Sequence, residues 1–315
     1  MAPSSKPSYP LYGATEENHT MGTQIGEARR SPPSITSNRE SKHKPFNWQR
    51  PTARFINNRL LIECFPGHNH VQHYAEIIAT YLMHKKSEGI ITTLPSKVSF
   101  IPCSPSDTWD ALWQTNLREL PREVTTVVLG RVHRLEKLTG PIEWPGDSRE
   151  CFQWTVRQFN NRKVAFIGFR PSFWGDIAGG IVHFLSAVCK VHEVLYFGKL
   201  ATVRKWVRPN TWLATGGKSI MRGKAVEWEN VLRHSVAPLV GSYVLKGNHI
   251  TVGNILHETN DWLAMFGYLH VISDNVAEKY DDPLNEWIQS AFAQRKLKIY
   301  EVVQNVFWDH LSSGR

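Results

Sequence analysis

Three apolar stretches, TTVVLGR (residues 125–131), VAFIGFR (residues 164–170) and EVLYFGK (residues 193–199), decide the fold of this chain. Each is a short continuous apolar run with a glycine near its end and a basic residue as its last member. Helix-length segments separate the runs, and strands that helices cover on both faces have this composition. The sequence therefore predicts an α/β fold with a single wound, mostly parallel sheet and helices on both faces.

Further elements are expected on both sides of these strands. Trp109, Leu112 and Trp113 have the spacing of one helical face and are expected to pack. Gly179 and Gly180 are expected to let their helix approach a strand closely. The remaining predicted strands are residues 59–65, 98–102, 211–217, 249–252 and 268–273, and the predicted helices are residues 72–86, 107–117, 152–160, 177–188, 257–266 and 283–311.

The chain divides into a tail and one domain. Residues 1–45 are rich in Ser, Pro and charge and poor in branched aliphatic residues. Such a segment cannot bury enough apolar surface to offset the entropy of ordering, so it is predicted to be disordered. Residues 46–315 are long enough for a single α/β domain with a substantial core.

Charge and cysteine content narrow the functional classes. The formal net charge of +9 and the pI near 9.4 favour polyanionic partners, and a basic enzyme with a solvated surface explains them equally well. The four cysteines have no CxxC spacing, which predicts buried reduced thiols without a metal or disulfide framework. The chain has neither an apolar signal core nor a run of 18 apolar residues, so we expect a cytoplasmic protein without membrane contact.

The expected site lies at the carboxyl ends of the three main strands, where ligands bind in open α/β sheets. Arg131, Arg170 and Lys199 stand at these ends and are predicted to bind substrate. A basic edge of this kind suits phosphate, nucleotide or RNA. His133 follows Arg131 closely, and two flanking guanidinium groups would lower the pKa of its imidazole, as suits a neutral base or a phosphate clamp.

The loop RPSFWGD (residues 170–176) leaves a strand and enters a helix, where backbone N–H groups and the helix dipole favour an anion. Ser172 is a candidate nucleophile or phosphate ligand, and Asp176 is a candidate substrate-binding carboxylate. The competing interpretation is that Ser172 caps the helix and Asp176 complements its dipole. Both interpretations remain open.

Three carboxylates near the carboxyl end, Asp281, Asp282 and Glu286, are candidates for holding a cationic substrate group, for holding a metal ion or for acid and base catalysis. Asp282 precedes Pro283 and is also a good helix cap, so both roles remain open. The TGGKS segment (residues 215–219) lacks the spacing of a phosphate-binding loop and is expected to be a turn. His68, His70 and His73 have no metal-ligand spacing, and structural roles are expected for them.

Residues 164–274 resemble the purine nucleoside and uridine phosphorylase fold. The resemblance rests on the order of elements: a strand, a Gly-containing loop and a helix come first, and the segment VLYFGKLATVRKWVRPN, a turn and a late strand follow. In addition, WPGDSR (residues 144–149) is similar to the phosphate-binding loop of that family, which contains Gly-Asp and an arginine. It implies a nucleoside-phosphorylase-like sheet and, as an activity, a nucleoside phosphorylase or nucleosidase.

A second resemblance runs from LGRVHRLEKLTGPIEWPGDSRE (residues 129–150) to SDNVAEKYDDPLNEW (residues 273–287) and is to the fungal arginine-containing cyclodipeptide synthases. Asp281, Asp282 and Glu286 give a DDxxxE pattern close to the DDxxE motif of that family. The resemblance implies catalysis by these three residues, with Ser172 as the acyl acceptor by analogy with bacterial cyclodipeptide synthases. It implies arginyl-tRNA and a second aminoacyl-tRNA as partners, and neither a cofactor nor a metal.

The leading expectation is therefore an aminoacyl-tRNA-dependent cyclodipeptide synthase that joins arginine to a second amino acid, giving a diketopiperazine in alkaloid secondary metabolism. The alternative is a nucleoside phosphorylase or nucleosidase. A third hypothesis is a non-catalytic RNA-binding protein, which would bind RNA with a steep salt dependence and form no product.

Overall fold

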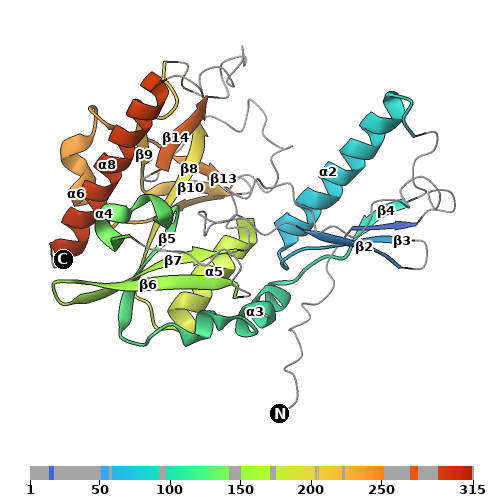
Figure 1. The fold of residues 1–315 in the computed structure, drawn as a ribbon, viewed down its shortest axis with the longest axis horizontal. Coiled ribbons are helices and arrows are strands. Elements are labelled where there is room, and N and C mark those ends of the chain that lie inside the picture. The colour runs from blue at the N-terminus through green and yellow to red at the C-terminus, as the bar shows by residue number, and fades with distance from the viewer. Residues whose placement is uncertain are drawn as a thin grey trace.

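A computed structural model gives the fold of the chain (Figure 1). Its described residues are 14–17, 51–56, 59–91, 97–141, 150–170, 175–202, 204, 206–221, 224–251, 270–275 and 290–313. All structural statements below concern these residues.

A seven-stranded sheet with the order β12-β9-β14-β8-β5-β7-β6 forms the centre of the fold. The three strands that the apolar runs predict are confirmed as β5, β7 and β8, and β5 lies between the other two, parallel to both. The pairings β14–β9 and β6–β7 are antiparallel, so the sheet is mixed. Its strands are β5 Val124–Gly130, β6 Phe152–Phe159, β7 Arg162–Phe169, β8 Glu193–Thr202, β9 Leu213–Thr215, β12 Val244–Lys246 and β14 His270–Asn275.

The predicted helix over residues 152–160 is wrong, because this segment is strand β6. It forms a hairpin with β7 through a two-residue connection, Asn160 and Asn161, in which Asn160 has a φ of 48°. Asn tolerates the left-handed conformation that tight hairpin turns need. Aromatic and β-branched residues such as Trp154 and Val156 then suit the pleated strand.

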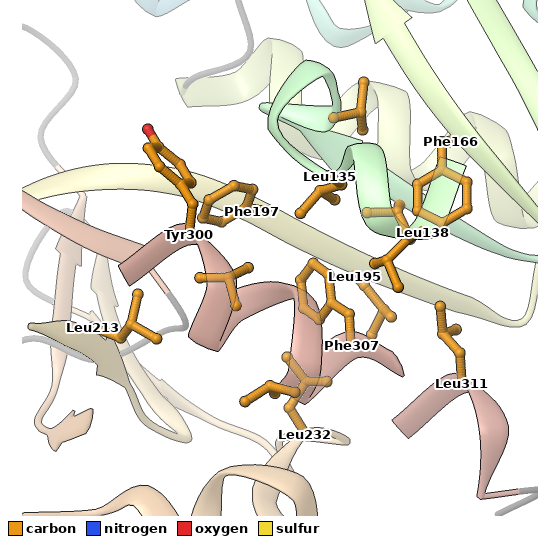
Figure 2. Close-up of a cluster of buried hydrophobic side chains, with 14 of the residues drawn as sticks. Leu135, Leu138, Phe166, Leu195, Phe197, Leu213, Leu232, Tyr300, Phe307 and Leu311 are labelled. Carbon is orange, nitrogen blue, oxygen red and sulfur yellow. The ribbon is translucent and has the colours of Figure 1, made fainter. Parts of the chain in front are cut away.

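Side chains alternate between the two faces of the sheet, and each face packs against helices. On one face, Val127 and Leu129 of β5 join a buried cluster with α3 (Pro105–Trp113) and α5 (Gly175–Ala187). On the other face, Val128 joins a cluster with α8 (Ser290–Ser312), α4 (Glu136–Thr139) and α6 (Arg233–Val236). Figure 2 shows this second cluster, in which Phe307 of α8 points toward β8. The predicted α/β class with helices on both faces is confirmed.

The tryptophans of α3 pack as predicted. The rings of Trp109 and Trp113 lie 5.2 and 5.4 Å from the ring of Phe184 in α5. Gly180 also contributes to this helix contact, because an added Cβ would lie 3.0 Å from Cγ2 of Thr108 in α3. At Gly179 an added Cβ would meet no atom within 4 Å. The expected close approach of these glycines to a strand is therefore wrong, and Gly180 faces a helix.

Helix α8 is joined to the amino end of β8 by a polar cluster. Nε2 of His310 lies 2.9 Å from Oε1 of Glu193. The other carboxylate oxygen of Glu193 accepts from Nη1 of Arg162 at 3.4 Å and from Oγ1 of Thr126 at 3.3 Å. Burial alone would raise the pKa of Glu193, but the hydrogen bond and charge of His310, with Arg162 and Thr126, hold it below its ordinary value.

Two smaller sheets accompany the central one. The first is antiparallel, with the order β2-β3-β1-β4, and α2 (His68–Ser87) packs beside β4. The second has the order β11-β10-β13. Within residues 1–45, expected to be a disordered tail, the structure describes only strand β1. The strands are β1 Ala14–Glu17, β2 Thr52–Ile56, β3 Arg59–Glu63, β4 Lys97–Phe100, β10 Lys218–Met221, β11 Lys224–Glu227 and β13 His249–Thr251.

The four cysteines, all within the described residues, form no disulfide bond. Cys103, Cys151 and Cys189 are buried, as predicted, whereas Cys64 is half-buried. Burial raises the pKa of the Cys103 and Cys189 thiols to about 11. Among the helices of the described residues, none combines the length and hydropathy that crossing a bilayer would need.

Candidate functional site

Arg131 and Arg170 leave neighbouring strands at the same edge of the sheet. In the parallel pair β5 and β7, Leu129 lies opposite Ile167, so the two arginines follow the carboxyl ends of both strands. The backbone N–H of Arg131 donates to the carbonyl oxygen of Phe197 at 2.9 Å, and that of Arg170 donates to the carbonyl oxygen of Cys151 at 2.9 Å. The two cationic residues are thereby anchored by their backbones at one edge.

Gly130 allows the end of β5 to come close to β8. Its φ is +102°, and an added Cβ would lie 2.1 Å from the carbonyl oxygen of Phe197. Any larger residue would therefore push β5 away from β8. The glycine before Arg131 thus fixes where this arginine emerges from the sheet.

The side chain of Arg131 is half-buried, and its Nε is fully buried with no hydrogen-bond acceptor among the described residues. Tyr196 of β8 lies close enough for the Arg131 charge to lower the pKa of its phenol, although burial has the larger effect and raises that pKa overall. A buried N–H donor without an acceptor costs free energy. The side chain as a whole is only half-buried, so it brings a positive charge to this edge, where an anionic ligand could bind.

Sequence reasoning missed Tyr196 as a neighbour of Arg131. It belongs to the predicted strand of residues 193–199, whose apolar pattern predicts only a strand residue at this position. Along β8 it alternates with Phe197, which packs in the cluster with α8, whereas Tyr196 packs with α5. That two-residue period is the signal that places Tyr196 on the same face as Leu129 of β5.

The short 3-10 turn Val132–Arg134 carries the other basic residues of this region. Cζ of Arg134 lies 5.7 Å from the ring centroid of Tyr300 in α8, which is within cation–π distance. Arg134 therefore packs on α8, and His133 is half-buried beside it in sequence. The expected lowered pKa of His133 stays a prediction.

The expected position of Lys199 at the end of its strand is wrong, while its predicted role in substrate binding stays a prediction. Strand β8 continues to Thr202, because its second half pairs with β14, where Lys199 lies opposite Val271. Gly130 at the end of β5 lies opposite Phe197, so Lys199 is two residues beyond this level along β8. Its side chain is exposed.

Asp176 joins two helices at their amino-terminal ends. Its Oδ2 accepts from the backbone N–H of His68 at 2.6 Å, and its Oδ1 accepts from that of Asn69 at 3.1 Å. These are the first two residues of α2, while Asp176 lies in the first turn of α5. Asp176 therefore caps the amino-terminal end of α2 from its place in the first turn of α5, and its predicted role in substrate binding stays a prediction.

The four residues predicted to be catalytic, Ser172, Asp281, Asp282 and Glu286, lie outside the described residues. The loop of residues 144–149 and the predicted helix of residues 257–266 also lie outside them. The structure therefore does not bring the predicted carboxylates into relation with Arg131 and Arg170, and their roles stay predictions.

The histidines and the TGGKS segment have structural surroundings. His70 is buried with Nδ1 3.1 Å from the carbonyl oxygen of Phe65, and burial lowers its pKa. Lys218 begins β10 and pairs with Glu227 at 2.8 Å, so the segment connects two strands, as expected for a turn. No group of three or more His, Cys, Asp or Glu side chains in the described residues is arranged to hold a metal ion.

No protein-family model and no curated protein matches the chain. Its fold is similar to uridine phosphorylase from Vibrio fischeri, with a TM-score of 0.42 and 10% identity over 63% of this chain and 94% of that chain. It is similar to 5′-methylthioadenosine/S-adenosyl homocysteine nucleosidase from Campylobacter jejuni, with a TM-score of 0.40 and 9% identity over 60% and 99% of the two chains. For a futalosine hydrolase mutant of Helicobacter pylori the TM-score is 0.38, with 9% identity over 58% and 96%.

These likenesses concern the fold alone. The expectation of an aminoacyl-tRNA-dependent cyclodipeptide synthase in alkaloid metabolism is nevertheless wrong, because the similar solved structures are named as nucleosidases, a hydrolase and a phosphorylase. Binding of charged tRNA has not been tested and stays a prediction.

Proposed function

We propose that the chain is an enzyme that cleaves the N-glycosidic bond of a nucleoside with inorganic phosphate as the second substrate. The observation that carries the proposal is the half-buried cationic side chain of Arg131 directly after the carboxyl end of β5. Arg170 follows the neighbouring parallel strand at the same edge. The resemblance of residues 164–274 to nucleoside phosphorylases supports the nucleoside part of the proposal.

The reaction assigns a plain electrostatic role to these arginines. A phosphate oxygen attacks C1′ of the sugar, the bond from C1′ to the base nitrogen breaks, and the base leaves with the electron pair and takes up a proton. Guanidinium groups bind phosphate oxygens through charge-assisted hydrogen bonds, often two at once. Arg131 and Arg170 would hold the phosphate in position for this attack.

Incubation of the full chain with adenosine, inosine or uridine and inorganic phosphate tests the proposal. The expected products are the free base and ribose 1-phosphate, separated by chromatography. The variant Arg131→Gln should raise the KM for phosphate by about tenfold or more, because a hydrogen bond to a charged group is lost. Arg122→Gln is the matched control, because Arg122 is exposed and precedes the opposite, amino end of β5.

Two results would overturn the proposal. One is the absence of free base with all of the nucleosides while circular dichroism shows a folded protein. The other is release of free ribose at a rate that phosphate does not change, which would assign hydrolysis and remove the phosphate-binding role of Arg131.

A further inference from the structure

Trp206 is held in an exposed position in the segment that follows β8. Its side chain is 59% exposed, whereas the next residue, Val207, is 1% exposed and packs with Ala214 and Ile272. Trp212 lies beside Trp206 with ring centroids 5.7 Å apart and an interplanar angle of 90°. The exposure of Trp206 therefore follows from the anchoring of its neighbours.

Hydrogen bonds fix the same segment on both sides of Trp206. The N–H of Arg204 donates to Oγ1 of Thr202 at 3.2 Å, and the N–H of Val207 donates to the carbonyl oxygen of Arg204 at 3.0 Å. Further along, the N–H of Asn210 donates to the carbonyl oxygen of Ile272 in β14 at 2.7 Å. An aromatic ring held in this way loses little conformational entropy when a ligand stacks on it.

The charges around Trp206 distinguish it from the other exposed tryptophans of the described residues. Arg204 and Arg208 are both exposed and lie two residues before and two residues after it. Trp308, which is 55% exposed, is followed by the exposed Asp309. Trp113, which is 42% exposed, shares its helix with the exposed Asp110. We call Trp206 with Arg204 and Arg208 the Trp206 patch.

We propose that the Trp206 patch binds single-stranded nucleic acid. A base would stack on the indole, and the guanidinium groups on both sides would neutralise the flanking phosphates. Proteins that bind single strands without sequence preference combine these two features, an aromatic platform and a basic track. The net charge of +9 would steer a polyanion toward the protein from a distance.

Single strands fit the patch better than duplexes or lipid. The bases of a duplex are stacked on one another and offer no free face to Trp206. A membrane surface would require a wider apolar area, whereas Val207 next to Trp206 is turned into the core. The inference does not depend on the proposed nucleoside cleavage, since Arg131 and Arg170 are not part of the patch.

Fluorescence anisotropy with a labelled short oligoadenylate tests the inference on the full chain. Trp206→Ala should weaken binding by about tenfold through loss of one stacked base, and Trp206→Phe should recover part of it. The matched control is Trp308→Ala, which removes an indole of similar exposure beside an acidic residue and should leave the affinity unchanged. Arg208→Gln should lower the slope of log K against log salt by about 0.7, the value for one phosphate of a single strand.

Three outcomes would overturn the inference. The first is an equal loss of affinity in Trp206→Ala and Trp308→Ala. The second is competition by a duplex of the same length as effective as competition by the single strand. The third is Trp206-dependent binding of phosphatidylserine vesicles in the absence of oligoadenylate binding. Failure of any kind here would leave the assay for nucleoside cleavage unaffected, so the two proposals are tested separately.

Discussion

Gly67 shows how tightly a single position can be constrained at a helix junction. It precedes α2 with an extended backbone, φ −171° and ψ 128°, which any residue can adopt. An added Cβ, however, would lie 2.3 Å from Cγ1 of Ile177, a fully buried residue of α5. The requirement for glycine is therefore steric and comes from the packing of α5.

We expect Gly67→Ala to lower the free energy of unfolding by about 1–3 kcal/mol, because the added methyl group must displace a buried side chain. Urea denaturation monitored by circular dichroism measures this change. Gly179→Ala is the matched control, because its Cβ meets no atom within 4 Å and helical alanine stabilises by about 0.5–1 kcal/mol. If neither variant changed the free energy of unfolding, the packing argument would be contradicted.

At the scale of elements, the contact between α8 and β8 rests on both apolar packing and one charged cluster. Phe307 and Leu311 of α8 are fully buried against the sheet (Figure 2). His310, in the same helical segment, reaches the carboxylate of Glu193 at the first residue of β8. Apolar packing therefore holds the last turns of α8 against the sheet, and the contact between His310 and Glu193 fixes their position along β8.

Glu193→Gln should lower the free energy of unfolding by about 1–3 kcal/mol near neutral pH, because the charge-assisted bonds from His310 and Arg162 weaken. The folded-state pKa of Glu193 lies below its ordinary value of 4.5. The contribution of ionised Glu193 to the free energy of unfolding is thus fully present above pH 4.5, and it is lost as the pH falls through the folded-state pKa. Denaturation curves of both proteins from pH 7 down to acid measure the difference, which should shrink only below about pH 4.5.

Glu123→Gln serves as the control for this effect. Glu123 also faces a cation, Lys163 at 3.2 Å, but both side chains are exposed. Water screens exposed ion pairs, so this variant should be close to wild type in stability at every pH. A pH-independent difference between wild type and Glu193→Gln would refute the assignment of the charge interaction to Glu193.

At the scale of the whole molecule, α2 is connected to the central α/β body at two polar points. Asp176 of α5 accepts from the first two N–H groups of α2, and Oγ1 of Thr108 in α3 donates to the carbonyl oxygen of Pro66 at 3.1 Å. Figure 1 shows the amino-terminal end of α2 near this body and its carboxyl-terminal end projecting away from it. The amino-terminal end of α2 therefore carries the connection.

Removal of the carboxylate in Asp176→Ala should make the amides of α2 exchange with solvent faster, because two backbone N–H groups lose their acceptor. We expect about a fivefold to thirtyfold increase, corresponding to the typical cap contribution of about 1–2 kcal/mol. Amides of β5 and β7 should keep their protection, which hydrogen exchange measured by mass spectrometry can show. Asp309→Ala, at an exposed position on α8, is the control and should leave the exchange of the α2 amides unchanged. Faster exchange throughout the central sheet in Asp176→Ala would refute a local role of Asp176.

Local sequence patterns determined two kinds of element: strands that are buried on both faces, and helices that bury one side along their length. The apolar runs of β5, β7 and β8 and the periodic segments of α2, α3 and α5 were predicted, because burial leaves its period in the sequence. The convergence of Arg131 and Arg170 followed as well, since parallel neighbouring strands end at one edge.

Tertiary structure alone decided the features that depend on partners far away in the chain. Strand β6 pairs with β7, β8 extends to Thr202 because β14 lies beside it, and Asp176 binds N–H groups 108 and 107 residues away. A side chain's own sequence neighbours carry information about whether it is buried. They carry none about which distant strand or helix end supplies its partner, because that choice is made by the packing of the whole sheet.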